Sequence, residues 1–107
     1  MSDHTIVFVT APSSDVASSL ARTLVEEGLV ACCNIVPGVR SIYRWEGQIC
    51  DDAEVLMVME SRAARFETLQ TRLAALHPYS VPKIVSVDIA QGFGPYLSWL
   101  TDNVPTD

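Results

Sequence analysis

The chain has few basic residues. Lysine and arginine together number 7, against 13 aspartates and glutamates, which gives a formal net charge of −6. A protein that binds nucleic acid needs basic surface to meet the phosphates, and anionic membranes likewise attract basic segments. The composition therefore argues against nucleic acid and against a membrane surface as partners.

Long apolar runs are also missing. No stretch approaches the roughly 20 apolar residues of a membrane-spanning helix. Met1 is followed by Ser2, Asp3 and His4 rather than by a basic segment and an apolar run, so we expect no signal peptide and a cytoplasmic location. The three cysteines lack the count and spacing of a disulfide scaffold, and we expect them to be reduced thiols.

Recognisable catalytic motifs are absent as well. The sequence contains no GxSxG, no P-loop, no HExxH and no glycine-rich phosphate-binding loop. Only two histidines, His4 and His77, are available as a general base. No nucleophile, base and orienting group can be assembled from these residues, so we expect a protein that is not an enzyme.

Apolar side chains, in contrast, are abundant. They make up 49% of the 107 residues. A domain of this size buries a smaller fraction of its surface than a larger one, so a monomer would leave much of this apolar surface in water. We expect a single domain over residues 1–107 that assembles into an oligomer.

Hydrophobic periodicity predicts the order strand, helix, strand, strand, helix, strand, with a short C-terminal helix. The expected segments are Thr5–Thr10, Ser14–Glu27, Val30–Trp45, Gln48–Glu60, a helix capped by Ser61 and ending at His77, Ile84–Ile89, and a helix that starts near Pro95. This is the ferredoxin-like βαββαβ order. It belongs to the α+β class, with one antiparallel sheet and helices on one face.

Finer features follow from local residue types. Pro37-Gly38 predicts a bulge in the second strand, and Trp45-Glu46-Gly47 predicts a hairpin turn. The first and third strands contain continuous apolar runs, so we expect both of their faces to be covered. The last helix should turn Tyr96, Trp99 and Leu100 inward, and the tail from Asn103 should fray.

Cys32 and Cys33 are adjacent in a strand, so their side chains should point to opposite faces and should not share one metal. His77 ends the second helix. There it could bind copper or zinc as a neutral imidazole, or it could make a structural hydrogen bond.

Charged residues gather on the central hairpin. Asp51, Asp52 and Glu54 could form a cation site or a solvated edge. Arg40 and Arg44 share a face and could receive an anion or a carboxylate of a neighbouring chain, and we favour the interface.

Three segments together resemble the CutA family of divalent-cation tolerance proteins. They are ACCNIVPGVRSIYRWEGQI from Ala31, HPYSVPKI from His77, and YLSWL from Tyr96, in matching order and spacing. The resemblance implies a homotrimer of ferredoxin-like subunits in which extended hairpins lengthen the sheet of a neighbour. It also implies a role in copper or divalent-metal tolerance.

The resemblance further implies candidate site residues. Cys32 and His77 match the family's cysteine and HPY histidine, and we assign both as metal ligands. Copper-site proposals in the family also use a cysteine and a histidine where this chain has Val9 and Leu76. A thiolate and an imidazole are what copper prefers, so we expect only weak binding of copper or another divalent metal.

The remaining assignments concern clefts and interfaces between subunits. Trp45, Glu54 and Tyr79 are expected to line a binding cleft, and the interface is expected to include Arg40, Tyr43, Glu60 and Lys83. At these two positions the family often carries charges of the opposite sign, and this chain exchanges both. We therefore expect Glu60 and Lys83 to form an ion pair, either within one chain or between subunits. The alternatives are a sensor of small molecules or anions like the PII signal proteins, and a structural trimer that binds other proteins.

Overall fold

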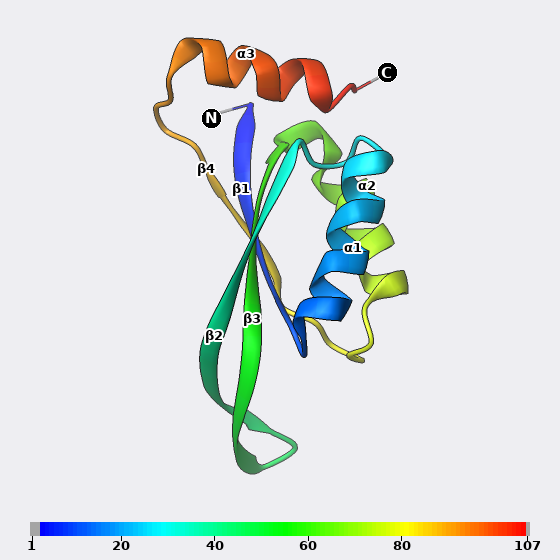
Figure 1. The fold of residues 1–107 in the computed structure, drawn as a ribbon, viewed down its shortest axis with the longest axis vertical. Coiled ribbons are helices and arrows are strands. Elements are labelled where there is room, and N and C mark those ends of the chain that lie inside the picture. Colours follow the sequence, from blue (N-terminus) through cyan, green and yellow to red (C-terminus); the bar gives the residue numbers. More distant parts are fainter. Residues whose placement is uncertain (1–2, 107) are drawn as a thin grey trace.

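The computed structural model describes residues 3–106. Its elements follow the expected order, with a 3₁₀ turn, η1, before the second helix (Figure 1). Their bounds are β1 His4–Ala11, α1 Ser14–Glu26, β2 Cys32–Trp45, β3 Gln48–Arg62, η1 Ala63–Arg65, α2 Phe66–Leu76, β4 Ile84–Asp88 and α3 Gly94–Asn103. Within the described residues, no helix has the length and apolar character needed to cross a membrane.

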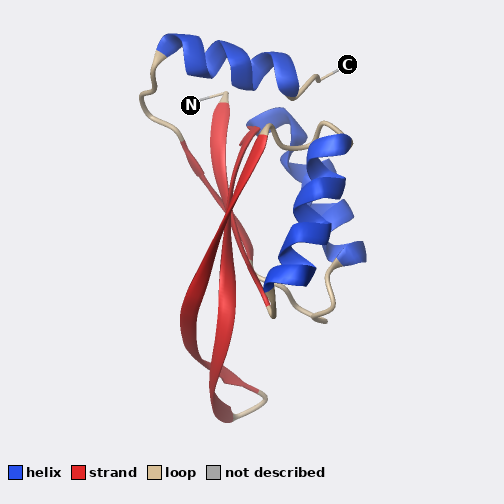
Figure 2. Ribbon diagram, viewed as in Figure 1, coloured by secondary structure: helices blue, strands red, loops and turns tan. Residues whose placement is uncertain are grey.

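The four strands form one antiparallel sheet in the order β2-β3-β1-β4. Both α1 and α2 pack on the same face of this sheet, whereas α3 lies across its end (Figure 2). The α+β, ferredoxin-like fold predicted from the sequence is therefore confirmed.

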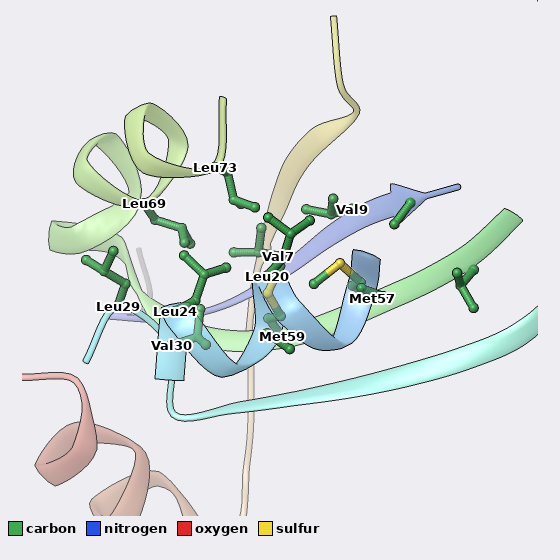
Figure 3. Packing of buried hydrophobic residues seen from close by; sticks show 14 residues of the cluster. Val7, Val9, Leu20, Leu24, Leu29, Val30, Met57, Met59, Leu69 and Leu73 are labelled. Carbon is green, nitrogen blue, oxygen red and sulfur yellow. The ribbon is translucent and has the colours of Figure 1, made fainter. Parts of the chain in front are cut away.

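The core lies between the sheet and the two helices (Figure 3). Ser13 caps α1 by accepting a hydrogen bond from the Val16 backbone N–H, and the stripe that includes Leu20 and Leu24 is buried. Alternate strand residues meet this stripe, as shown by Val7 paired with Met59 and by Val9 paired with Met57.

The β2–β3 hairpin extends well beyond the helices (Figure 1). Its register shifts between Val36 and Val39, which confirms the bulge predicted at Pro37-Gly38. At its tip Glu46 and Gly47 both have positive φ, at 50° and 78°. Two consecutive residues with positive φ are typical of a type I′ turn, whose twist matches that of the strands.

The expected covering of both sheet faces is wrong within one chain. On the face away from α1 and α2, the apolar side chains are only partly buried or are exposed. These side chains, which define the open face, are Ile6, Phe8, Leu56, Val58, Val85 and Val87. The apolar runs are continuous, but this chain places helices on one side only.

The predicted start of the second helix is also wrong. Ser61 does not cap a helix; it belongs to β3, is fully buried, and donates from Oγ to the Leu29 carbonyl at 2.7 Å. The strand continues to Arg62, and η1 then leads into α2. A serine hydroxyl can satisfy either a helix N-terminus or a distant carbonyl, and local sequence does not distinguish the two.

The end of the chain is better ordered than expected. Leu100 and Val104 are fully buried, whereas Tyr96 and Trp99 are 41% and 44% exposed, so of the three predicted inward residues only Leu100 faces inward. The Val104 carbonyl accepts a hydrogen bond from Arg62, so the tail does not fray at this point.

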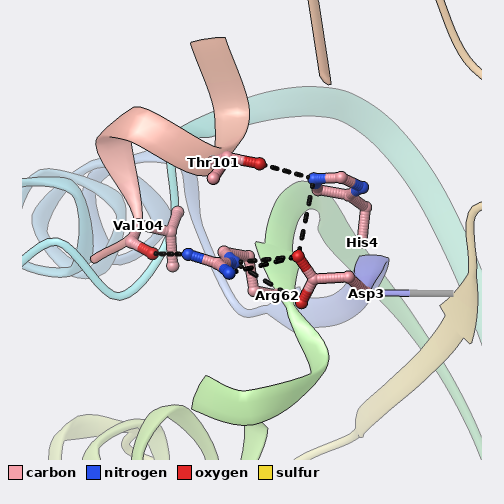
Figure 4. Close-up of polar contacts among 5 residues, drawn as sticks. All are labelled: Asp3, His4, Arg62, Thr101 and Val104. Carbon is pink, nitrogen blue, oxygen red and sulfur yellow. Dashed lines mark hydrogen bonds and ion pairs between the residues drawn. The ribbon is translucent and has the colours of Figure 1, made fainter. Parts of the chain in front are cut away.

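Polar contacts join α3 to the start of β1 and the end of β3 (Figure 4). Arg62 forms an ion pair with Asp3 at 3.2 Å, and the His4 ring lies 2.8 Å from the Thr101 hydroxyl. These contacts connect residues far apart in the sequence, and no local pattern predicts them.

Candidate functional site

A hollow of about 720 Å³ lies where the hairpin leaves the sheet. We call it the hairpin hollow. Its walls come from the end of β1, the outer part of the hairpin, and the loop between α2 and β4. The lining residues are Thr10, Val39, Arg40, Ser41, Ile42, Tyr43, Trp45, Glu54, Leu56, Tyr79, Ser80, Val81 and Lys83.

The structure brings most of the predicted site residues to this hollow. The three predicted cleft residues, Trp45, Glu54 and Tyr79, all line it. Three of the predicted interface residues also line it, namely Arg40, Tyr43 and Lys83. Cys32, Glu60 and His77 are not among the lining residues. That these residues bind a ligand or a neighbour stays a prediction.

Two tyrosines of the hollow donate hydrogen bonds to carboxylates. The Tyr79 hydroxyl lies 2.6 Å from Glu54 Oε2, and the Tyr43 hydroxyl lies 2.6 Å from Asp52 Oδ2. The hydrogen bond to Asp52 raises the pKa of Tyr43 to about 12. Burial, followed by the bond to Glu54, raises the pKa of Tyr79. Both phenols are therefore protonated at neutral pH and act as donors.

The acidic residues of the hairpin do not converge on a cation site. Asp51 points to the opposite face of the hairpin from Asp52 and Glu54, as strand alternation requires. There it accepts two hydrogen bonds from Arg40, at 2.8 and 2.6 Å, which lower the pKa of Asp51. Each of the three carboxylates thus has its own partner in the chain.

His77 is buried, and both of its ring nitrogens are engaged. Nε2 lies 2.8 Å from the Thr10 carbonyl, and the Tyr79 backbone N–H donates to Nδ1 at 3.1 Å. A carbonyl can only accept and an N–H can only donate, so the neutral tautomer with a proton on Nε2 satisfies both bonds. A metal could bind this ring only by displacing one of them.

The two adjacent cysteines point to opposite faces, as predicted. Cys33 packs against the core, and burial raises its pKa to about 12. Cys32 lies opposite Glu60 in the sheet, and burial together with the Glu60 charge raises its pKa as well. Metals bind the thiolate, so a raised pKa opposes binding at neutral pH.

Cys32 and His77 do not lie together in one chain. Cys32 is level with Glu60 and Ile6, whereas His77 contacts Thr10, four residues further along β1. Four strand residues span roughly 13 Å. Among residues 3–106, no group of three or more His, Cys, Asp or Glu side chains is arranged to hold a metal ion.

Glu60 and Lys83 also lie apart. Glu60 accepts a hydrogen bond from the Tyr96 hydroxyl at 2.9 Å, while Lys83 lines the hollow just before β4. The predicted ion pair between them does not form within the described chain. Tyr96 was missed as a partner of Glu60 because its partner is 36 residues away and no local pattern relates the two.

Comparison with known proteins gives a consistent result. The CutA1 divalent ion tolerance protein family matches residues 5–103. A "Divalent-cation tolerance protein CutA" of Thermus thermophilus is 49% identical over 98 residues, which cover 92% of this chain and 95% of the relative. The "Crystal structure of CutA1 from Oryza sativa" superposes with a TM-score of 0.95 at 35% identity, covering 99% of this chain and 97% of that one.

Some relatives are longer. A protein of Arabidopsis thaliana named "Protein CutA, chloroplastic" is 39% identical over 98 residues. These residues cover 92% of this chain and 54% of the relative, so the chain spans about half of that protein's length.

Proposed function

This chain belongs to the CutA family of divalent-cation tolerance proteins, and on that premise we propose that it acts in tolerance of copper or another divalent metal as a non-enzymatic homotrimer in the cytoplasm. The family is named for tolerance and not for a reaction. The three cysteines are all free, which suits a reducing compartment.

The observation that carries the assembly is the open face of the sheet. Val85 and Val87 are 46% and 50% exposed there, beside the half-buried Ile6, Phe8 and Val58. A contiguous apolar face of this kind is typical of an interaction site. It explains the apolar excess of the sequence, because assembly would bury what the helices leave uncovered.

The sheet edges support a closed ring. The two edge strands, β2 and β4, differ in length and sequence, and both carry unpaired backbone groups. Pairing of one edge with the other edge of a neighbour is a head-to-tail contact, which forms a ring when the rotation closes. We propose that the hairpin reaches the neighbouring subunit and that Arg40, Tyr43, Glu60 and Lys83 contribute to this interface.

Metal binding by one chain is proposed to be weak. Both nitrogens of His77 are occupied, the Cys32 thiol is protonated at neutral pH, and the two lie apart. A single side chain that must first give up a hydrogen bond or a proton binds a metal ion with modest affinity, so we do not propose that the protein sequesters metal. We propose that Cys32 and His77 bind copper or zinc transiently.

Metal titration tests this proposal. Purified reduced protein is kept anaerobic, its mass is checked by light scattering, and zinc(II) or copper(I) is titrated against a competing chelator. We expect weak binding that decreases in Cys32→Ala and His77→Ala but not in Cys33→Ala, which is the matched control because Cys33 faces the core. Tight stoichiometric binding, or weak binding unchanged in both variants, would contradict the proposed ligands.

A second candidate function is a small-molecule sensor, which the hairpin hollow favours. Its volume lies within the range of roughly 300–1,000 Å³ that is usual for ligand sites. Its lining combines aromatic rings with a few polar groups, as such sites do.

A further inference from the structure

Two hydrogen bonds of one residue attach the loop between α2 and β4 to the rest of the chain. The Tyr79 backbone N–H donates to His77 Nδ1 at 3.1 Å, and the Tyr79 hydroxyl donates to Glu54 Oε2 at 2.6 Å. The two prolines of the loop have no N–H to donate. No other hydrogen bond or ion pair joins residues 78–83 to any residue from 3 to 106. We call the two bonds of Tyr79 the Tyr79 latch.

Most of the loop is exposed to solvent. Pro78, Ser80, Val81 and Lys83 are exposed, and none of them belongs to the main core or to the small second core under α3. A segment with few buried apolar contacts and few hydrogen bonds opens at a small cost in free energy. The position of the loop therefore depends on the Tyr79 latch.

The His77 ring is oriented as a metal-binding histidine is. Histidines that bind a metal through one ring nitrogen usually donate the N–H of the other nitrogen to a backbone carbonyl or a carboxylate. His77 already donates from Nε2 to the Thr10 carbonyl at 2.8 Å. The lone pair left for a metal is that of Nδ1, which the Tyr79 N–H occupies. A metal ion and this N–H therefore compete for the same lone pair.

The bond at Nδ1 is the more accessible of the two bonds of the ring. It is partly buried, whereas the bond from Nε2 to Thr10 is buried. A metal ion that approaches from solvent therefore reaches the Tyr79 side of the ring first. Loss of the bond on that side leaves the bond to Thr10 in place, so the imidazole stays attached to β1 while the loop loses one of its two attachments.

We propose that the Tyr79 latch opens when a divalent metal ion binds Nδ1 of His77, and that its opening releases the loop of residues 78–83. The inference rests on the proposed binding of metal at His77 and adds what this binding does to the chain. The loop leads directly into β4, an edge strand of the sheet, and forms one wall of the hairpin hollow. Weak binding would thus change the surface that we assign to a neighbouring subunit, without sequestration of the ion.

The test follows His77 and Tyr79 separately by NMR. Zinc(II) is added to the reduced, assembled protein, because it is diamagnetic and does not oxidise thiols. The ¹⁵N signals of the His77 ring report whether the metal binds, and hydrogen exchange of the Tyr79 backbone amide reports whether the latch opens. We expect the ring signals to shift and the exchange to become about fivefold faster at saturating zinc, as the loss of one hydrogen bond provides.

Lys83 gives a second measurement on the loop. It is the only lysine in the chain, so labelling with ¹⁵N-lysine yields a single backbone amide signal, which lies at the end of the loop. We expect the heteronuclear NOE of this amide to fall when zinc is added, because fast backbone motion increases in a released segment.

Variants assign the effect to the latch. In His77→Asn the side-chain oxygen can still accept from the Tyr79 N–H but no imidazole is present, so zinc should leave the exchange of this amide unchanged. Cys32→Ala removes the other proposed ligand, which lies apart from the loop, so zinc should still accelerate the exchange. Tyr79→Phe removes only the bond to Glu54, and it should bind zinc about fivefold more tightly, because less of the latch has to be broken.

Three results would overturn the inference. If zinc shifts the His77 ring signals but leaves the Tyr79 exchange unchanged, the proposed metal binding stands and the latch does not. If zinc accelerates the exchange equally in His77→Asn, the metal acts through another residue. If zinc changes neither the ring signals nor the exchange, the proposed metal binding at His77 fails together with the latch.

Discussion

His77 is a residue whose surroundings leave little freedom. Its two ring nitrogens meet one backbone acceptor and one backbone donor, at 2.8 and 3.1 Å. Its ring also lies against Tyr79, with centroids 4.7 Å apart. The bond to the Thr10 carbonyl is buried and the bond from the Tyr79 N–H is partly buried, and both would be lost if the imidazole were removed. The side chain therefore joins α2, β1 and the following loop.

Two substitutions separate these bonds. In His77→Asn the side-chain oxygen sits near the position of Nδ1 and can accept from the Tyr79 N–H, whereas in His77→Gln the amide nitrogen sits near Nε2 and can donate to Thr10. We expect each variant to lose about 1 kcal/mol of unfolding free energy, and His77→Ala to lose roughly 2 kcal/mol, in urea denaturation.

Hydrogen exchange of the Tyr79 backbone amide distinguishes His77→Asn from His77→Gln. The exchange should stay slow in His77→Asn and become faster in His77→Gln, because only the first keeps an acceptor for this N–H. Equal exchange rates in both variants would show that Nδ1 does not hold the loop.

Residue types alone were informative where the chemistry is local. The opposite orientation of Cys32 and Cys33 follows from strand alternation, and the positive φ at Gly47 follows from the turn. The prediction for Ser61 was wrong because a serine before a helical pattern fits a helix cap as well as it fits the buried strand residue that the structure shows. Its carbonyl partner, Leu29, is 32 residues away.

At the scale of elements, α3 shows how a short helix depends on tertiary contacts. It has no side-chain cap and only ten residues, a length that is marginal for an isolated helix in water. Its position comes from a small second core, in which Leu100 and Val104 pack with Ala31, and from the bonds of Arg62. The helix is therefore stabilised mainly by packing.

Truncating the buried face of α3 should destabilise the protein strongly. We expect Leu100→Ala to lose about 2–5 kcal/mol of unfolding free energy, because Leu100 is fully buried and its removal leaves a cavity. Leu76→Ala is the control. Leu76 is 38% exposed at the end of α2, so its truncation should change stability by less than about 1 kcal/mol.

Both variants should be measured by urea denaturation at one protein concentration, since the proposed assembly would make stability depend on concentration. Equal losses of unfolding free energy in the two variants would show that α3 does not have a hydrophobic core of its own.

Periodicity alone selected Leu100 as inward-facing but also selected Tyr96 and Trp99, because any of several neighbouring stripes of a short apolar helix can face the sheet.

At the scale of the whole molecule, the distribution of apolar surface is uneven. The helix-covered side of the sheet is filled by the main core, while the open face leaves apolar side chains in solvent. This asymmetry is the physical basis for the proposed trimer, in which copies of the chain would cover what the helices do not.

A pair of matched valines tests this assembly. Val85 on the open face is 46% exposed, and Val25 on α1 is 43% exposed on the opposite side of the sheet. We expect Val85→Asp to dissociate the trimer, because a charge would be buried without a partner, and Val25→Asp to leave it assembled. Size-exclusion chromatography with light scattering measures both masses.

A trimeric Val85→Asp variant, or dissociation of both variants, would contradict an interface on the open face. Circular dichroism of each variant shows whether the subunit is still folded. The comparison is sharp because the two residues have the same type and nearly the same exposure, so only their location differs.

The sequence by itself determined the order of the elements, the single sheet, the hairpin with its bulge and turn, and the family. These features depend on periodicity, turn chemistry and motif spacing, which are local. It also selected six residues that line the hairpin hollow, through the family resemblance. Tertiary structure alone decided what each of these side chains contacts.

The bonds of His77 to Thr10, of Tyr79 to Glu54, of Tyr96 to Glu60 and of Ser61 to Leu29 all join segments that are distant in sequence. Such contacts depend on how the elements pack, and no local pattern encodes them.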